Sequence, residues 1–427
     1  MDAALEQETI AIARDLIRID SVNTGDPATM GDGEERAARY VRDRLAEVGI
    51  SGEFLLPTPG RGNFIVRIPG RDRSAGALLV HAHLDVVPVD AADWSVPPFA
   101  AEIREDDAYG EVLYGRGAVD MKGFAAAVVA VARSGVVPRR DLVLAFLADE
   151  EAGGVWGAKW LVENRPDLFA GVTEALGEVG GFSVPLPTAH DGVRRAYLLA
   201  TAEKGAGWVR LRARGPAGHA ATPGPDTAVL RLARAVAALG EHRFPVERTD
   251  ATLPFRSAFS ELTGQDAWPG LVDAGLRHSA VPTMLAAGYK LNVIPGEAVA
   301  EVDTRVVPGG EAGFRREVER IVGEDVTVEW VLSNAPVVAP VDGPLVQTVR
   351  EAVAHDDPDG VVVPYLLPAS TDNKSFSRLG VAGYGFTPLR VPDGFDAFGQ
   401  FHAVDERVPL TALRFGARVL QRILRTA

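Results

Sequence analysis

The chain has 427 residues, 47% of them hydrophobic, and this length and composition predict a globular protein of two or three domains. A net charge of −14 argues against nucleic acid or an anionic membrane as a partner, and no apolar stretch approaches membrane-spanning length. With no cysteine and no signal-peptide pattern, we expect a cytoplasmic protein that has neither disulfides nor thiolate metal ligands.

The first two hundred residues alternate between helical and strand-like patterns. Apolar positions that recur on one helix face predict helices over residues 4–18 and 33–50. An Ala-rich apolar segment predicts a buried helix over 121–135, and short aliphatic runs predict buried strands at 63–68, 76–85 and 141–149. Strands that alternate with helices favour an α/β domain with a mostly parallel sheet.

The pattern changes near residue 203. Two strand-like segments, a helix, a strand pair and a further helix follow, at 197–218, 230–239, 289–309 and 315–322, with an irregular stretch at 240–285. This order is typical of a small α+β domain. Because residues able to bind metal reappear at position 402, we expect the small domain to be inserted into the first. We predict a discontinuous catalytic domain, residues 1–202 and 319–427, around an inserted domain, residues 203–318.

A strand with polar residues at its end opens the candidate site. In the run HAHLDVVP, strand alternation places His81, His83 and Asp85 on one face. They lie at the carboxyl end of the predicted strand, the end at which α/β sheets bind ligands. The residues alone do not decide which histidine binds a metal, and a buried structural histidine is the alternative for either.

Further carboxylates follow other predicted elements. Asp120 precedes the Ala-rich helix, where it either binds a metal or caps the helix. Glu150 and Glu151 follow a strand; because adjacent carboxylates repel, one is expected to bind metal and the other to move protons, with a solvated acidic turn as the alternative. Glu178 and His402 carry little weight singly. Together these side chains form a ligand set suited to two divalent ions and to metal-assisted hydrolysis.

Four runs in fixed order carry a family resemblance: HLDVVP at 83–88, GRGAVDMKG at 115–123, DEE at 149–151 and HAVDE at 402–406. They resemble the M20 family of metallopeptidases and amidohydrolases, and the similarity covers essentially the whole chain. That family includes glutamate carboxypeptidases, aminoacylases, acetylornithine deacetylases and succinyl-diaminopimelate desuccinylases. The resemblance implies that the inserted domain serves as a dimerisation or lid domain, and that the protein is a homodimer.

The matched positions imply a role for each residue of the metal centre. The implied cofactors are two divalent ions, most simply zinc, with cobalt or manganese as alternatives. The first ion is held by His83 and Glu178, the second by Glu151 and His402, and Asp120 bridges both. Asp85 orients His83, Glu150 is the general base, and His81 is left as a packing residue. The peptide bond between Asp120 and Met121 is expected to be cis.

The inserted domain carries its own matched residues. His219 in GPAGHA resembles a histidine that reaches the partner subunit's active site and donates a hydrogen bond to the oxyanion. Asn292 and Arg305 resemble substrate-binding residues, and an arginine suits capture of a carboxylate. Ser370 replaces a glycine common in the family, so it is a candidate pocket residue. Glu178 stands where the family uses either Asp or Glu.

The implied reaction is hydrolysis of the amide bond of N-acyl amino acids or short peptides with a free carboxylate. A dipeptidase or carboxypeptidase-type exopeptidase of the same family is the alternative, since the two differ only in what the acyl pocket tolerates. A non-catalytic metabolite-binding relative is a third possibility. It predicts loss of the general base or of a ligand, and all these positions carry suitable residues.

Overall fold

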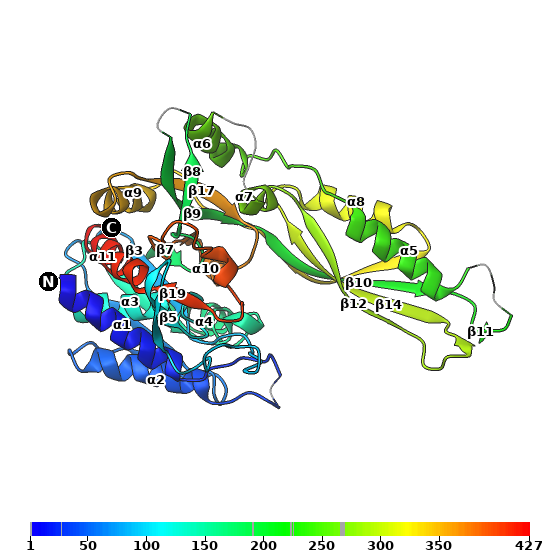
Figure 1. The fold of residues 1–427 in the computed structure, drawn as a ribbon, viewed down its shortest axis with the longest axis horizontal. Coiled ribbons are helices and arrows are strands. Elements are labelled where there is room, and N and C mark those ends of the chain that lie inside the picture. Colours follow the sequence, from blue (N-terminus) through cyan, green and yellow to red (C-terminus); the bar gives the residue numbers. More distant parts are fainter. Residues whose placement is uncertain (1, 27, 190–191, 223, 225, 265–269) are drawn as a thin grey trace.

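The computed structural model describes residues 2–26, 28–189, 192–222, 224, 226–264 and 270–427. Figure 1 shows a large body that contains both chain ends and a slender second body that projects from it and ends at β11 (Gly218–His219). Of the described helices, none is both long and apolar enough to cross a bilayer.

A ten-stranded sheet forms the centre of the large body. Its strands run in the order β1-β2-β6-β3-β7-β18-β9-β16, and β8 and β17 also pair with β9. The central strands β6, β3, β7 and β18 are mutually parallel, as the alternation of strands with helices predicted, and antiparallel strands flank them. The strands are β1 (Glu53–Leu55), β2 (Asn63–Ile68), β3 (Ala77–His83), β6 (Leu142–Leu147), β7 (Val172–Gly177), β8 (Ser183–Pro187), β9 (Val193–Glu203), β16 (Val337–Val338), β17 (Gly360–Leu367) and β18 (Ala382–Gly385).

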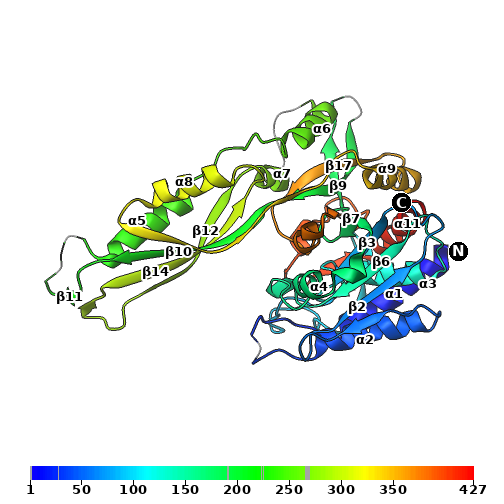
Figure 2. The same cartoon turned by 180° about the vertical axis from the view of Figure 1, so that it is seen from behind.

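Helices cover both faces of this sheet, which explains why its central strands consist mostly of buried apolar residues. Alternate residues of β3, such as Leu78 and Val80, pack toward one helical layer, and Leu79 packs toward the other. The first layer contains α1 (Asp2–Arg18), α2 (Gly33–Ala46), α3 (Lys122–Arg133), α9 (Pro344–Asp356) and α11 (Leu410–Thr426). The second contains α4 (Ala158–Asn164) and α10 (Asn373–Phe376). Figure 2 shows α4 on the side of the sheet that Figure 1 hides.

A small three-stranded sheet lies beside the large one. It has the order β19-β5-β4, made of β4 (Ile103–Asp106), β5 (Gly110–Tyr114) and β19 (Arg407–Pro409). Arg407 pairs with Tyr114, so the chain leaving β5 and the chain entering β19 lie side by side. This pairing brings residues after 114 and before 407 together, although nearly three hundred positions separate them.

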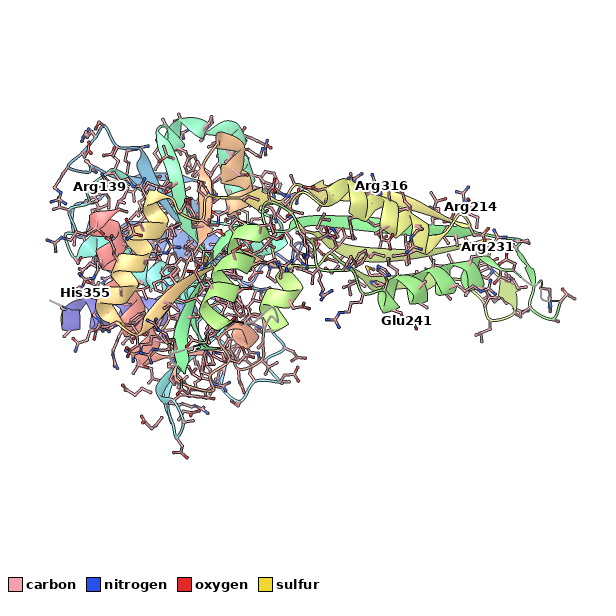
Figure 3. All side chains as sticks on the ribbon, turned by 90° about the horizontal axis from the view of Figure 1, so that it is seen from above. Arg139, Arg214, Arg231, Glu241, Arg316 and His355 are labelled. Carbon is pink, nitrogen blue, oxygen red and sulfur yellow. The ribbon has the colours of Figure 1, made fainter. Side chains whose placement is uncertain are left out.

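The projecting body is a four-stranded antiparallel sheet in the order β12-β14-β10-β15, covered on one face by two helices. Figure 3 looks down on these helices, with Glu241 and Arg316 on their outer sides. The opposite face carries exposed apolar residues, among them Trp208 and Val281. The elements are β10 (Gly205–Arg214), α5 (Ala228–Glu241), β12 (Ser279–Ala287), β13 (Val293–Ile294), β14 (Glu297–Val306), α8 (Glu311–Val322) and β15 (Val326–Asn334).

The second sheet extends beyond the boundary placed at 318. Strand β15 pairs along β10 as far as Asn334, because its alternating pattern suits a sheet with one covered face. In the segment predicted to be irregular, α6 (Leu253–Thr263) and α7 (Gly270–Gly275) form and contact β17 of the large body. Residues 265–269 of that segment lie outside the described residues. The division at 203 and 318 therefore remains a proposal about folding units.

Candidate metal centre

Three parallel strands deliver ligand candidates to one edge of the large sheet. His83 is the last residue of β3, Glu150 and Glu151 open a short 3-10 helix (Glu150–Ala152) after β6, and Glu178 follows β7 directly. Because parallel strands end at a common edge, these side chains converge although they are far apart in sequence. Asp120 comes from the loop before α3.

Asp120 lies between two groups of side chains. Its Oδ1 lies 3.1 Å from His83 Nε2, and Glu178 Oε2 lies 3.3 Å from the same nitrogen. Its Oδ2 lies 3.2 Å from His402 Nε2, and Glu151 Oε2 is also 3.2 Å from that nitrogen. The two oxygens of Asp120 thus serve different groups, which is the arrangement expected of a bridging carboxylate. The peptide bond after Asp120 is cis, as the resemblance implied.

Several alternatives that the residues left open are resolved by this geometry. Met121, not Asp120, occupies the position that caps α3. Glu151 does not lie in a solvated turn, because its side chain is only 7% exposed. His81 points away from the cluster, and its Nε2 lies 2.9 Å from Asn373 Oδ1. His83 is therefore the histidine of β3 that joins the cluster, and His81 packs beneath α10.

The site is suited to cations in its present form. Glu151 Oε1 and Glu178 Oε1 are buried without a hydrogen-bond partner, a costly state for a carboxylate unless a ligand occupies it. The oxygens and nitrogens of His83, Asp120 and Glu151 lie close enough to hold an ion, as do those of His83, Glu150 and Glu178. No cysteine competes, so the donors are nitrogen and oxygen only.

The shifted pKa values in the cluster also show that its buried carboxylates favour a bound positive charge. Burial raises the pKa of Glu150 well above its usual range and that of Glu178 to about 7, with neighbouring carboxylates adding to the effect. Hydrogen bonds to Asp120 and Glu151 raise the pKa of His402 to about 10. Excess negative charge in a buried space thus favours any bound cation.

Asp85 has a wider structural role than orienting His83. The Oδ1 atom of Asp85 is 3.5 Å from His83 Nδ1, and the backbone oxygen of Asp85 lies 3.0 Å from the same ring nitrogen. Its carboxylate also accepts hydrogen bonds from the amides of Glu150 at 3.1 Å and Glu151 at 3.0 Å. One buried side chain therefore positions a histidine of the first group and the turn that carries both glutamates.

Residues that the sequence did not single out support this turn from behind. Asn23 donates to Asp85 and to Asp149, each at 3.0 Å. Arg61 donates to Asn23 and forms an ion pair with Glu34, and all three side chains are buried. No motif marked them, because Asn23 lies in a loop and its partners come from distant segments. Asp372, in the run with Ser370, is a further buried acid whose pKa burial and Glu178 raise.

The predicted residues of the projecting body do not reach the cluster within this chain. His219 forms β11 at the far end of that body, and Asn292 precedes its partner strand β13 (Figure 1). Arg305 lies at the near end of the sheet, opposite Ala206, and donates two hydrogen bonds to Asp303.

Ser370, the predicted pocket residue of the large body, is partly buried. It lies next to Thr371, whose hydroxyl donates a hydrogen bond to Glu203.

Comparison with known proteins identifies the family. The sequence model of peptidase family M20/M25/M40 matches residues 79–426, which is most of the chain. The chain belongs to this family. As an M20 protein it is a metal-dependent hydrolase, and the match confirms the family resemblance carried by the four sequence runs.

Relatives and solved structures agree with this assignment. Human aminoacylase-1 is 27% identical over 91% of this chain and 89% of its own length. A probable carboxypeptidase S-like 2 from Dictyostelium discoideum is 29% identical over 80% of this chain and 70% of its own length. Human carnosine dipeptidase 1 shares the fold with a TM-score of 0.71 at 17% identity, covering 99% and 96% of the two chains. A dinuclear metal-binding M20 peptidase from Bacillus subtilis has a TM-score of 0.62 at 16% identity, covering 99% and 98%.

Proposed function

We propose that this M20 enzyme uses two divalent ions, most simply zinc, to hydrolyse the amide bond of N-acyl amino acids or short peptides with a free carboxylate. The position of Asp120 between two ligand groups carries the two-ion part of the proposal. His83 and Glu178 would hold one ion, Glu151 and His402 the other. Bound ions would supply Lewis acidity toward a water molecule and toward the amide carbonyl.

Glu150 is proposed as the residue that moves the proton. Its carboxylate lies close to His83 and Glu178, and its backbone amide donates a hydrogen bond to Asp85. Burial raises its pKa well above its usual range, which makes it a stronger base than an exposed carboxylate. Glu150 takes a proton from the attacking water and hands it to the leaving nitrogen.

Recognition of the substrate is proposed to involve the projecting body. Arg305 lies where that body joins the larger one, and the neighbouring Lys204 and Lys374 lie close enough to interact with its charge. These cations favour a carboxylate-bearing substrate. Since His219 lies far from the cluster of its own chain, we propose that a second copy supplies it as the hydrogen-bond donor to the carbonyl oxygen. The activity of human aminoacylase-1, 27% identical, supports acyl amino acids as the substrate class.

The proposal is tested with a panel of N-acyl amino acids and dipeptides, assayed with zinc, cobalt or manganese and again after chelation. We expect chelation to abolish cleavage and added metal to restore it. Cleavage of dipeptides alone would assign the exopeptidase alternative. Cleavage that persists without metal would refute the two-ion mechanism.

The general base is tested by Glu150→Gln. We expect kcat to fall by about 10²–10⁴-fold, because the amide cannot accept a proton, while the metal content stays unchanged. The matched control is Glu163→Gln, an exposed glutamate in α4 that forms a surface ion pair with Arg378, and it should keep full activity. Full activity of Glu150→Gln would assign the proton transfer to another group.

A further inference from the structure

Two loops that carry ligands of the same proposed ion lie next to each other. Residues 115–121 follow β5 and carry Asp120, whereas residues 402–406 precede β19 and begin with His402. The pairing of β5 with β19 brings the loops together, and the amide of Gly115 donates to the backbone oxygen of Glu406 at 2.9 Å. The strands alone, however, fix only one end of each loop.

The carboxylate of Glu406 holds the Asp120 loop along its length. Its Oε1 accepts from the amides of Val119 at 2.7 Å and Asp120 at 3.0 Å. Its Oε2 accepts from the amide of Gly117 at 2.9 Å and from Arg116 Nη1 at 2.8 Å. Each of the four contacts is a donor, so both oxygens must act as acceptors. Hydrogen bonds from three backbone amides, those of Gly117, Val119 and Asp120, fix the backbone of the loop that carries the proposed bridging ligand.

Arg116 connects the same carboxylate to the other loop. Its Nη2 donates to the backbone oxygen of His402 at 3.3 Å, while Nη1 binds Glu406. The guanidinium also lies over the ring of Trp94, with 5.3 Å to the ring centroid. Arg116 is 3% exposed and Glu406 is fully buried, so solvent does not screen the pair.

We propose that Glu406 is a positioning residue that sets Asp120 and His402 at a fixed spacing and thereby forms the binding site of the second ion. It touches neither proposed ligand side chain; it acts through the backbone of one and through Arg116 on the other. Of the proposed ligands of the first ion, Glu406 holds only the shared Asp120, and its contacts described above do not include His83 or Glu178. Binding of the first ion therefore depends less on Glu406 than binding of the second. The inference rests on the two-ion function proposed above.

The test is a metal titration of apo-enzyme against a chromophoric chelator, applied to wild type and to Glu406→Gln. Glutamine keeps the size of the side chain but replaces one acceptor with a donor that opposes the loop amides. We expect the affinity for the second ion to fall by about 10- to 100-fold and the affinity for the first to change far less. The visible spectrum of the cobalt form reports on the same site independently of activity.

Two further variants keep the outcome decisive. Arg116→Lys retains the charge but cannot contact both Glu406 and His402, so it should weaken the second ion in the same direction. Glu105→Gln changes an exposed glutamate of β4 in the same small sheet and should bind both ions as wild type does. If Glu406→Gln does not fold, Arg116→Lys decides by the same measurement.

The possible results separate this inference from the function on which it rests. Selective weakening of the second ion supports the positioning role. Unchanged affinities, or equal weakening of both ions with a lower melting temperature of the apo-enzyme, overturn it and leave Glu406 as a structural residue. A wild-type enzyme that binds a single ion would instead refute the two-ion proposal itself.

Discussion

Burial is the largest cause of the pKa shifts of three side chains in this enzyme, Glu150, Glu178 and His278. Inside the metal centre, burial favours the uncharged form of Glu150 and Glu178, and that preference is what a bound cation would oppose. Outside the centre, the same effect acts on His278, which lies between Phe244 and Phe314 in the projecting body. Its Nδ1 accepts from the amide of Val307 at 3.0 Å. A buried neutral histidine makes stability depend on pH.

We predict that His278 destabilises the folded state as the pH falls from about 6.5 toward 4. Burial, with help from Lys204, lowers its pKa to about 4 and outweighs the contact with Glu247. In that window the unfolded chain binds a proton that the folded chain does not, so stability is lost as pH falls. The variant His278→Asn keeps an acceptor for the amide of Val307 but does not titrate. Between pH 7 and pH 4 its free energy of unfolding should fall by up to about 3 kcal/mol less than that of wild type. Melting temperatures across this range measure the difference, with exposed His355→Asn as the control that should match wild type.

Among the elements, the contact between β3 and β7 positions the first ligand group. A Cβ added to Gly177 of β7 would lie 2.2 Å from the ring of His81 in β3. His81 is also held by Asn373, whose side chain donates to Glu203 at 3.2 Å. Only a glycine leaves room for this ring, which lies two residues before His83. The strand pairing thus depends on a missing side chain.

We predict that Gly177→Ala lowers the free energy of unfolding by about 1–3 kcal/mol, because the ring or the strand must shift to admit a methyl group. Gly313→Ala in α8 is the control, since nothing lies near its Cβ position. That substitution should be neutral or stabilise by about 0.5–1 kcal/mol through helix propensity. Denaturant titrations of both variants compare the two. If Gly177→Ala were as stable as wild type, the ring of His81 would move aside at no cost in free energy.

On the scale of the whole molecule, the projecting body leaves large apolar side chains exposed along its edge strand. Its edge strand β12 exposes Met284 and Leu285, which are 67% and 62% exposed, and Leu291 beyond it is fully exposed. An exposed apolar edge strand offers unpaired backbone groups and apolar surface with which a second chain can pair. His219 and Asn292 lie at the end of the same body. These features agree with the predicted homodimer in which one copy completes the site of the other.

We predict that two inactive variants restore activity when they share a dimer. Glu150→Gln keeps His219, and His219→Ala keeps Glu150, so a mixed dimer contains one complete site if His219 acts across subunits. Unfolding and refolding an equal mixture should recover about one quarter of wild-type activity. Each variant refolded alone is the control. If His219 acts within its own chain, the mixture would stay as inactive as its components.

Local patterns in the sequence determined much of this protein. The helix at 4–18 and the strands at 63–68, 76–85 and 141–149 form close to where apolar periodicity placed them, because amphipathic spacing reflects burial on one face or on both. The sequence runs around His83, Asp120 and Glu151 indicated metal-assisted hydrolysis and the M20 family. These conclusions need only neighbouring residues, which is the information that a single sequence holds most directly.

Tertiary structure alone decided which distant groups meet. Glu406 and Asn23 carry no local sign of their partners, because their contacts depend on strand pairing and loop approach across much of the chain. The reach of the second sheet to Asn334 was likewise hidden, since alternation shows which face of a strand is covered but not which strand lies beside it. Local sequence therefore indicated the candidate metal ligands and the proposed general base, and long-range packing determined which residues hold them in place.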